Sequence, residues 1–483
     1  MVFLGFSAGL PLYLVFSSLS LWLREAGVDR ATVTYFSWAV LGYSFKFVWA
    51  PLVDRLPVPI LTRSLGRRRG WLLLAQLGVI ASILMMAGTD PQYNLSMMAV
   101  AAVLLGFSSA TQDIVVDAYR IEAAVPRLQA MLASTYVAGY RTGMIVAGAG
   151  ALYLAEGLGS TKELYNYEAW RLSYMIMASV MGIGIATTLL ISEPEVSREV
   201  QDGYPAHDYL RFFLVFLLSI ATFATALAVI PSSPQLFAGG WQGLFGFVYG
   251  ALSLVGALLL AYGVARGTAR LGLVNMEMVR QGYQAPLLDF LERYGKVALW
   301  VLLLVGFYRV SDIVMGVIAN VFYQDMGYTK EQIASVTKVF GVVVTITGSF
   351  LGGLLALRIG VMRVLMLGAV LVAVTNLLFM WLANTEPHIV SLTLVIIADN
   401  LAQGVAIAAF IAWLSALTNV SFTATQYAIF SSLMTLLPKV MGGFSGTIVN
   451  AIGYTQFFLF ASLLGVPVIA LIYFLRDKME FED

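Results

Sequence analysis

The chain has 483 residues, of which 60% are hydrophobic and 11% are charged, and its formal net charge is +1. Soluble globular proteins carry about 25% charged residues, so this composition excludes an ordinary soluble domain, and the near-neutral charge does not indicate a nucleic-acid partner. There is no cysteine, which excludes disulfides and thiolate chemistry. The two histidines, His207 and His388, lie near expected helix ends, so we expect neither a histidine metal site nor a bound cofactor.

Long apolar runs recur along the whole chain, and each is long enough to cross a bilayer as a helix. Lipid offers the backbone no hydrogen-bond partner, so the runs must be helical, and they lack the short alternating pattern of barrel strands. The first run has no basic leader and no convincing cleavage site, so we expect a first helix rather than a signal peptide. We therefore predict an all-α polytopic membrane protein. Its fourteen predicted spans lie near residues 1–23, 32–54, 71–88, 95–119, 130–155, 170–191, 207–231, 240–264, 297–324, 332–356, 361–383, 390–417, 423–450 and 453–475.

Lysine and arginine are unevenly distributed over the expected loops. With the N-terminus inside, eighteen of the 28 fall in inner loops and ends, five in outer loops and five within spans. Positive residues favour the cytoplasmic side, so both termini are expected there. Two long inner loops separate six spans, a two-span insert and six further spans. The predicted domains are an N-terminal six-helix bundle (1–193), a linker with a two-helix insert (194–265), a cytoplasmic amphipathic loop (266–296), a C-terminal six-helix bundle (297–476) and a cytoplasmic tail (477–483).

The two six-span units share a short motif. WAPLVDRL…GRRRGW (49–71) follows the second span, and GSFLGGLLALRIGVMR (348–363) lies between the tenth and eleventh spans. Each has a small or kinked helix end, then a cation, a glycine and another cation. The motif resembles the loop signature of the major facilitator superfamily, although Pro51 stands near the expected glycine and an insertion precedes Gly66. The resemblance implies two parallel repeats that enclose a midplane cavity and rock to alternate access.

The charges of the first copy are candidates for gating. Asp54 can accept from a helix N-terminus or pair with an arginine while the inner side is closed. The alternative is that Arg67–Arg69 only fix orientation by attracting anionic lipid, and we expect both to apply. The predicted gating residues are Asp54, Arg55, Arg67 and Arg68.

Two carboxylates four residues apart lie within the fourth predicted span, in the segment SSATQDIVVDAYRIE (108–122). A charge at the bilayer centre costs roughly 2.5–3.5 kcal/mol, so both should face protein or water. Asp113 and Asp117 share one helix face, where mutual repulsion and desolvation disfavour two ions. We therefore predict that they form a proton-coupling site, with protons as the coupling ion.

The alternative is that the charges within spans form static ion pairs. Lys46 and Arg141 are available to the paired aspartates, and Arg309 stands three residues before Asp312. Lys439 lies on a predicted helix that could bring it to Asp399. Intramembrane charges favour function in general, yet an individual pair can simply hold helices together.

Amides and aromatic rings accompany these charges. Rings stack on the C–H face of a sugar and amides bind its hydroxyls, so the pattern favours a sugar substrate. The alternative is that most tyrosines and tryptophans form interfacial belts. The predicted substrate-binding residues are Tyr43, Lys46, Gln112, Tyr140, Arg141, Arg309, Asp312, Asp399, Gln403 and Lys439.

Several longer blocks together resemble the anhydromuropeptide permeases, the AmpG family. The blocks are GFSAGLPLYL (5–14), FKFVWAPLVDR (45–55), GRRRGWLL (66–73), SATQDIVVDAYR (109–120), GYRTGM (139–144), the segment 308–341 and ATQYAIFSSLMTLLPKVMGGFSG (424–446). The family also has a two-span insert between its halves. The resemblance implies that the paired aspartates are essential, and it matches Lys46 and Arg141 to the family's F-K-F and G-Y-R motifs.

For function, the resemblance implies a major facilitator transporter of the bacterial inner membrane. Such a carrier imports N-acetylglucosaminyl-1,6-anhydro-N-acetylmuramic acid and its peptide derivatives with protons, for peptidoglycan recycling, and thereby influences β-lactamase induction. The expected partners are therefore the muropeptide, protons and membrane lipids, and the expected state is a monomer. The acetyl-CoA transporter branch is similar in sequence and remains an alternative. A non-transporting sensor is less favoured, as is a membrane enzyme, for which we find no acid–base or nucleophile cluster at a membrane face.

Overall fold

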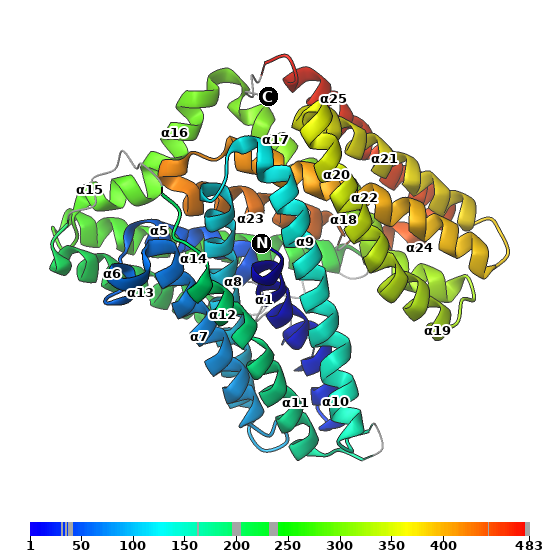
Figure 1. Cartoon of the computed structure of the whole chain (residues 1–483), viewed down its shortest axis with the longest axis horizontal. Coiled ribbons are helices and arrows are strands. Elements are labelled where there is room, and N and C mark those ends of the chain that lie inside the picture. Colours follow the sequence, from blue (N-terminus) through cyan, green and yellow to red (C-terminus); the bar gives the residue numbers. More distant parts are fainter. Residues whose placement is uncertain are drawn as a thin grey trace. The chain divides into compact units, whose positions relative to one another are not determined.

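The structure, a computed structural model, describes residues 1–29, 32–33, 36, 42–161, 164–195, 204–230, 240–442 and 444–478. All regular secondary structure in these ranges is helical, which confirms the predicted all-α class (Figure 1). The chain divides into two compact units, which are described separately. The first comprises Met1–Val53, Pro57–Ser197 and Tyr294–Asp483, and the second comprises Asp54–Leu56 and Arg198–Arg293.

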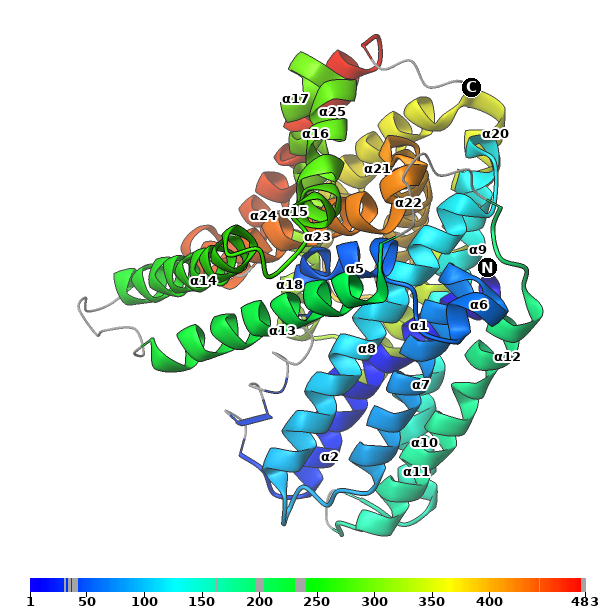
Figure 2. The same cartoon turned by 90° about the vertical axis from the view of Figure 1, so that its left-hand side faces the viewer.

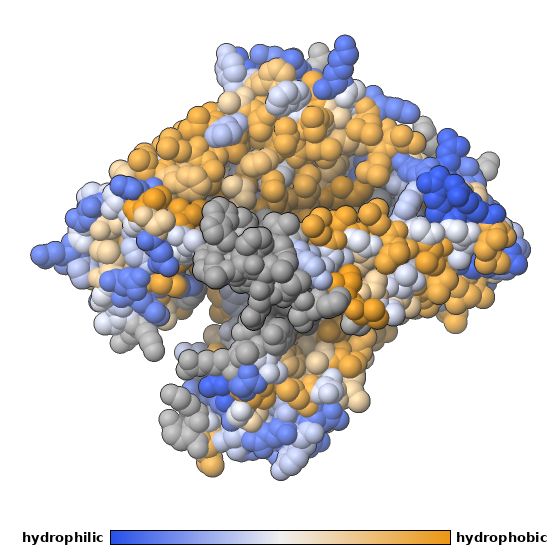
Figure 3. Space-filling model, turned by 180° about the vertical axis from the view of Figure 1, so that it is seen from behind, coloured by the Kyte–Doolittle hydropathy of each residue, from blue (hydrophilic) through white to orange (hydrophobic). Residues whose placement is uncertain are grey.

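Ten helical segments in the described ranges are long and apolar enough to cross a membrane. They coincide with ten of the fourteen predicted spans. Of the other four predicted spans, 1–23 and 130–155 contain π-helical turns and 32–54 includes residues outside the described set. The span 240–264 lies within one continuous helix, Gly240–Arg270, that is not among the ten, so the count of fourteen stays a prediction. Hydrophobic side chains cover broad areas of the face shown in Figure 3, as expected where lipid rather than water surrounds a protein.

The N-terminal half of the first unit is built around two long helices, α7 and α8. Helix α8 begins where the Asn94 side chain accepts a hydrogen bond from the backbone N–H of Met97 at 3.0 Å. Helix α7 packs against α8 and against α11 and α12, which follow each other end to end along one span (Figures 1 and 2). The helices of this half are α1 (Val2–Tyr13), α2 (Leu19–Glu25), α4 (Gly42–Phe45), α5 (Ala50–Arg55), α6 (Leu61–Leu65), α7 (Arg67–Ala87), α8 (Leu95–Glu122), α9 (Gln129–Ile145), α10 (Ala151–Gly157), α11 (Tyr167–Val180) and α12 (Gly182–Leu190).

The C-terminal half repeats this packing with α21 in the place of α7. Helix α21 packs against α22, α24 and α25. Both α7 and α21 start directly after a glycine with positive φ, Gly66 at 93° and Gly360 at 85°, a conformation that other residues rarely adopt. The motif shared by the two halves in sequence therefore has the same backbone form in both. The helices of this half are α17 (Ala298–Phe307), α18 (Val310–Asp325), α19 (Lys330–Ile333), α20 (Gly341–Ile359), α21 (Val361–Leu382), α22 (Ile389–Leu417), α23 (Thr423–Gly442), α24 (Ser445–Leu463) and α25 (Gly465–Leu475).

Each half has its own apolar core rich in aromatic rings. In the N-terminal half, the rings of Trp22 and Trp170 stack in parallel with centroids 5.6 Å apart. In the C-terminal half, Phe322 and Phe458 meet edge to face at 4.8 Å. Because the two cores are separate, polar side chains can gather where the halves meet. There α9 packs against α20 and α22, and α8 packs against α23.

The second unit consists of two long helices followed by shorter ones. Helices α13 (Ala206–Val229) and α14 (Gly240–Arg270) pack against each other. The predicted amphipathic loop is largely helical, with α15 (Met276–Val279), a π-helical turn and α16 (Ala285–Tyr294). An amide hydrogen of Asn275 donates to the Asp208 carboxylate at 3.1 Å and thereby ties this segment to α13.

Candidate functional site

A buried lysine joins the two aspartates of α8. Lys46 lies on a short 3₁₀ turn (Lys46–Val48) that follows α4, and its side chain is only 4% exposed. Its ammonium forms an ion pair with Asp113 and lies 3.5 Å from a carboxylate oxygen of Asp117. The spacing of four residues places both carboxylates on one face of the helix, as predicted, and one cation serves both.

Two tyrosines of α9 complete the wall next to this cluster. The hydroxyl of Tyr136 donates to Asp113 at 2.9 Å, and the ring of Tyr140 lies 5.7 Å from that of Tyr136. A Cβ at Gly5 or Gly9 of α1 would overlap the backbone of Tyr136 or Tyr140, so the small residues allow α1 to lie directly against α9. The close contact of the two helices fixes where both tyrosines stand.

Two further predicted site residues lie beside the cluster but contact other groups. The hydroxyl of Tyr43 forms a hydrogen bond with Ser109, one turn before Asp113 on α8. Gln112 is fully buried, and its amide donates to Ser7 of α1 at 3.3 Å, so it faces the interior of the N-terminal half. Its carbonyl oxygen has no hydrogen-bond partner among the described residues.

Arg120 continues the charged face of α8 and reaches the other half of the chain. Its side chain is fully buried, and its guanidinium donates to the Ser415 hydroxyl of α22 at 2.7 Å and to Gln129 at 3.2 Å. The same guanidinium lies 3.5 Å from Asp117 and 5.2 Å from the centre of the Tyr427 ring of α23. The paired aspartates are thereby connected to the contact between the halves.

The C-terminal half carries a more exposed ion pair. Arg309 stands between α17 and α18, and its guanidinium lies 2.5 Å from Asp312, with 24% and 12% of the side chains exposed. Arg141 of α9 lies near enough to Arg309 for the two cations to repel, and Tyr13, Tyr140 and Asp312 also lie within electrostatic reach of it. The structure thus places Arg141 with Arg309 rather than with the paired aspartates.

Asp399 and Lys439 do not meet in the described part of the chain. Asp399 is buried and accepts hydrogen bonds from the Gln403 amide at 2.7 Å and from the Thr375 hydroxyl at 3.3 Å. The Lys439 ammonium instead donates to Ser44 of α4 at 3.5 Å. The considered pairing of Asp399 with Lys439 is therefore wrong, because α23 directs the lysine towards the N-terminal half.

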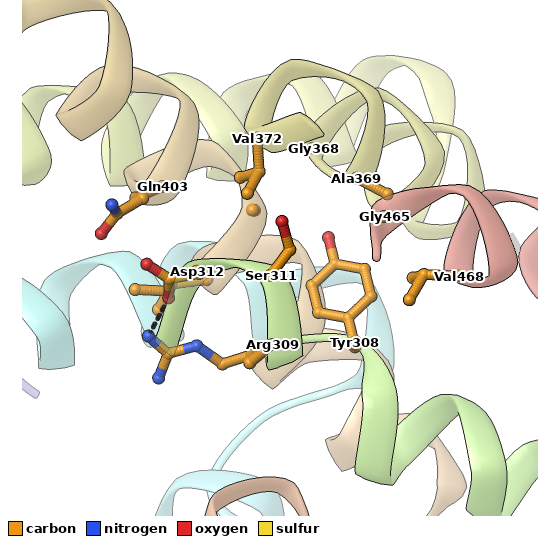
Figure 4. Close-up of a pocket in the computed structure, with 12 residues that line it drawn as sticks. Tyr308, Arg309, Ser311, Asp312, Gly368, Ala369, Val372, Gln403, Gly465 and Val468 are labelled. Carbon is orange, nitrogen blue, oxygen red and sulfur yellow. Dashed lines mark hydrogen bonds and ion pairs between the residues drawn. The ribbon is translucent and has the colours of Figure 1, made fainter. Parts of the chain in front are cut away.

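A small cavity of about 20 Å³ opens beside Arg309, which is room for about one water molecule. Figure 4 shows Tyr308, Arg309 and Asp312 along one wall, with the Gln403 amide near Asp312. The Tyr308 ring stacks on Phe410 with centroids 4.3 Å apart. Three of the predicted substrate-binding residues, Arg309, Asp312 and Gln403, therefore line one cavity.

Two of the predicted gating arginines, Arg67 and Arg68, lie at the start of α7. Arg68 is 1% exposed and binds the Glu122 carboxylate through two nitrogens, at 2.9 and 2.5 Å. The backbone N–H groups of Arg68 and Arg69 donate to Glu193 at 2.7 and 3.0 Å, which places a carboxylate at the positive end of the helix. In the second unit, Arg55 donates to the carbonyl of Gln281 at 3.0 Å.

Comparison with known proteins decides the family. The profile of the Major Facilitator Superfamily matches residues 1–279 and 300–482, which is nearly the whole chain. The chain belongs to the major facilitator superfamily. Its fold resembles that of the proton:xylose symporter XylE, with a TM-score of 0.63 over 98% of this chain and 93% of that one at 13% identity. It also resembles the human organic anion transporter MFSD10, with a TM-score of 0.55 over 98% and 97% of the two chains at 14% identity.

Relatives of this major facilitator chain carry the name that the sequence blocks predicted. The anhydromuropeptide permease of Escherichia coli K12 is 29% identical over all of this chain and 80% of its own length. Putative transporter AmpG 4 of Rickettsia felis is 29% identical over 99% of this chain and 95% of its own length. The predicted resemblance to this family is confirmed, and it extends along both halves.

Some members of the site could not be recognised from the sequence of this transporter. Tyr136 stands four residues before Tyr140, a helical spacing that places both rings on one face, and that spacing was the available signal. The fourth predicted span ends at residue 119, which leaves Arg120 in the following loop, yet α8 continues to Glu122 and buries it. Within the described ranges, no three His, Asp or Glu side chains gather as a metal site.

Proposed function

We propose that this major facilitator transporter imports N-acetylglucosaminyl-1,6-anhydro-N-acetylmuramic acid and its peptide derivatives across the bacterial inner membrane, as a monomer driven by the proton gradient. The fragments then enter peptidoglycan recycling and influence β-lactamase induction. Both termini face the cytoplasm in this proposal, as the loop cations indicate. The whole-length similarity to the Escherichia coli permease supports the choice of substrate.

The observation that carries the proton coupling is the buried ion cluster. Two carboxylates share Lys46, and Asp117 also has Arg120 at 3.5 Å, so the deprotonated cluster is electrically neutral. A proton that binds there leaves one uncompensated positive charge in a site of low dielectric, which is costly. The protonated carrier is therefore expected to change conformation or to accept an anionic substrate.

Two arginines, one from each half, supply the complementary part of the substrate site in this proposal. Arg141 and Arg309 lie near each other, so a carboxylate placed between them would relieve their repulsion. A muropeptide carries an acidic stem on a neutral disaccharide. In the proposal the arginines receive the stem carboxylates, while Gln403 and the Tyr140 ring contact the sugar.

The test is uptake of labelled anhydro-disaccharide, with and without stem peptide, into proteoliposomes with an imposed inward proton gradient. We expect accumulation that a protonophore abolishes. Asp113→Asn and Asp117→Asn should each lower accumulation against a gradient by at least about tenfold, because the amide cannot release a proton in this range. The matched control is Asp325→Asn, at the end of α18 and outside the cluster, which should accumulate normally.

Three results would overturn the proposal. Accumulation that ignores both protonophore and external acid would remove protons from the mechanism. Competition by coenzyme A thioesters, rather than by a chitobiose-like disaccharide, would replace the muropeptide with an acetyl-CoA type of substrate. Binding of muropeptide without flux into sealed vesicles would make the protein a sensor rather than a carrier.

A further inference from the structure

Arg120 is a fully buried cation at the contact between the two halves. It lies on α8, and its guanidinium donates to Ser415 of α22 at 2.7 Å and faces the Tyr427 ring of α23. Its Nε atom has no hydrogen-bond partner among the described residues. A cation in this position contributes to the contact only while its charge is compensated.

Asp117 is the carboxylate that compensates Arg120. The two side chains are separated by 3.5 Å at a helical spacing of three residues. Gln129 and Ser415 contribute neutral oxygens, which solvate the guanidinium but do not cancel its charge. Glu122, the next acidic residue on α8, is instead bound by Arg68 at 2.5 Å.

Asp117 has several titratable and charged neighbours. They reach it from its own helix, from the turn after α4, from α9 and from α23. These groups are Asp113, Arg120, Lys46, Tyr136, Tyr140 and Tyr427. Lys46 is already paired with Asp113, so a proton on Asp117 removes charge compensation chiefly from Arg120.

We propose that Arg120 is a positioning residue that links the charge of Asp117 to the contact between the halves. The inference rests on the proposed function, because it takes Asp117 as a proton-binding group. With Asp117 ionised, Arg120 stays in the interface and holds α8 to α22 and α23. Once Asp117 is protonated, the buried guanidinium loses its counter-charge, and moving to water lowers its free energy.

The geometry also gives the direction of the transition. Arg120 lies at the end of α8 that leads into the segment 123–128, on the side that the loop cations assign to the cytoplasm. Separation of the halves there opens the carrier inwards. A proton taken up from outside therefore favours release on the cytoplasmic side, which is the direction that proton-driven import requires.

The natural absence of cysteine allows a direct measurement of this opening. Val125 and Val420 belong to opposite halves, are 62% and 43% exposed, and line one cavity of about 480 Å³ next to Ser415. We would introduce V125C and V420C in the full-length chain, attach nitroxide labels and measure the distance distribution by electron–electron resonance in lipid nanodiscs. Acidification without any substrate should raise the ratio of long to short distances by at least about fivefold.

Two variants test the link from each partner. Asp117→Asn keeps the volume of the side chain and should show the long distance in acidic and alkaline buffer alike. Arg120→Gln still donates to Ser415 but carries no charge, so the short distance should persist in both buffers. Arg120→Lys retains the cation and should retain part of the response, which covers the case in which the glutamine variant does not fold.

The matched control is Ser134→Ala. Ser134 of α9 donates to the Ser349 carbonyl of α20 at 2.6 Å, a contact between the halves that involves no carboxylate. Its loss should shift the ratio equally at both pH values and leave the acid response intact. A normal acid response in Arg120→Gln, or a short alkaline distance in Asp117→Asn, would overturn the inference. Because the distance measurement uses no substrate, it tests this inference even if the protein does not take up muropeptide, and an uptake assay tests the proposed function on its own.

Discussion

The two halves of this transporter have the same helix packing, but they differ in how their buried charges are paired and how far those charges are exposed. In the N-terminal half, Lys46 is 4% exposed and compensates two carboxylates of α8. In the C-terminal half, the Arg309 side chain of the ion pair is 24% exposed and faces a cavity. Asp399, a buried carboxylate of the same half, has no cation within ion-pair distance among the described side chains.

This difference indicates that the Lys46 cluster and the Arg309 ion pair have different roles. A tightly packed and electrically balanced cluster responds strongly to a single added proton, because nothing nearby can absorb the extra charge. A partly exposed arginine is instead available to a ligand. We therefore expect loss of a charge in the Lys46 cluster to disturb stability and coupling, and loss of the Arg309 charge to disturb substrate affinity.

The largest expected effect comes from Lys46→Met. The substitution leaves Asp113 and Asp117 close together without their shared cation, and breaking a buried pair in this way costs roughly 3–5 kcal/mol. Thermal unfolding in detergent, followed by tryptophan fluorescence, should show a large fall in the unfolding temperature. Acid should restore part of the stability, because protonation removes the repulsion between the two carboxylates.

Lys439→Met is the matched control for that substitution. Lys439 donates to Ser44 at 3.5 Å and has no carboxylate within ion-pair distance among the described residues. Its loss should change stability by only about 1 kcal/mol or less, since a single hydrogen bond contributes about that much. Equal destabilisation by the two substitutions would contradict the asymmetry between the halves.

A smaller effect, on affinity alone, is expected from Arg309→Gln. A charge-assisted hydrogen bond to a stem carboxylate contributes about 1.5–3 kcal/mol, so KM for a peptide-bearing muropeptide should rise by about tenfold or more. KM for the disaccharide without peptide should stay unchanged. Arg358→Gln, an exposed position at the end of α20, provides the control with no expected change. An equal rise in KM for both substrates would show that Arg309 acts through the shape of the cavity rather than by binding the stem carboxylate.

The sequence predicted the fold and the acidic pair because both depend on local spacing. Apolar runs require helices in lipid, and the interval from Asp113 to Asp117 places two carboxylates on one face. Which side chains pair with these carboxylates depends on how helices that are distant in sequence pack together. Residue spacing within one helix carries little information about that packing. Lys46 was one of two candidate cations, whereas Arg141 turned out to lie with Arg309.

Helix ends were a second source of error, and Arg120 illustrates the reason. Hydropathy falls at Arg120, so the sequence suggested that the span had ended and that the residue belonged to a loop. The structure continues α8 by another turn and covers the guanidinium with residues of α22 and α23. Such a position is identified only when residues about 295 positions apart in the chain are brought together.

The smallest expected effect, and the sharpest test of the asymmetry, comes from Asp399→Asn. Asp399 is buried, and its two described partners, Gln403 and Thr375, are neutral, so an amide of the same size disturbs little. Stability should change by about 1 kcal/mol or less, and proton-driven uptake should stay within about twofold of the unsubstituted protein. Gln403→Leu is the useful companion, since it removes the 2.7 Å hydrogen bond and leaves the buried carboxylate poorly solvated, which should destabilise the protein more than Asp399→Asn does. A loss of uptake against a gradient in Asp399→Asn, with muropeptide binding retained, would contradict this expectation. Both halves would then take part in ion coupling, because Asp399 would have to bind a proton in addition to the Lys46 cluster.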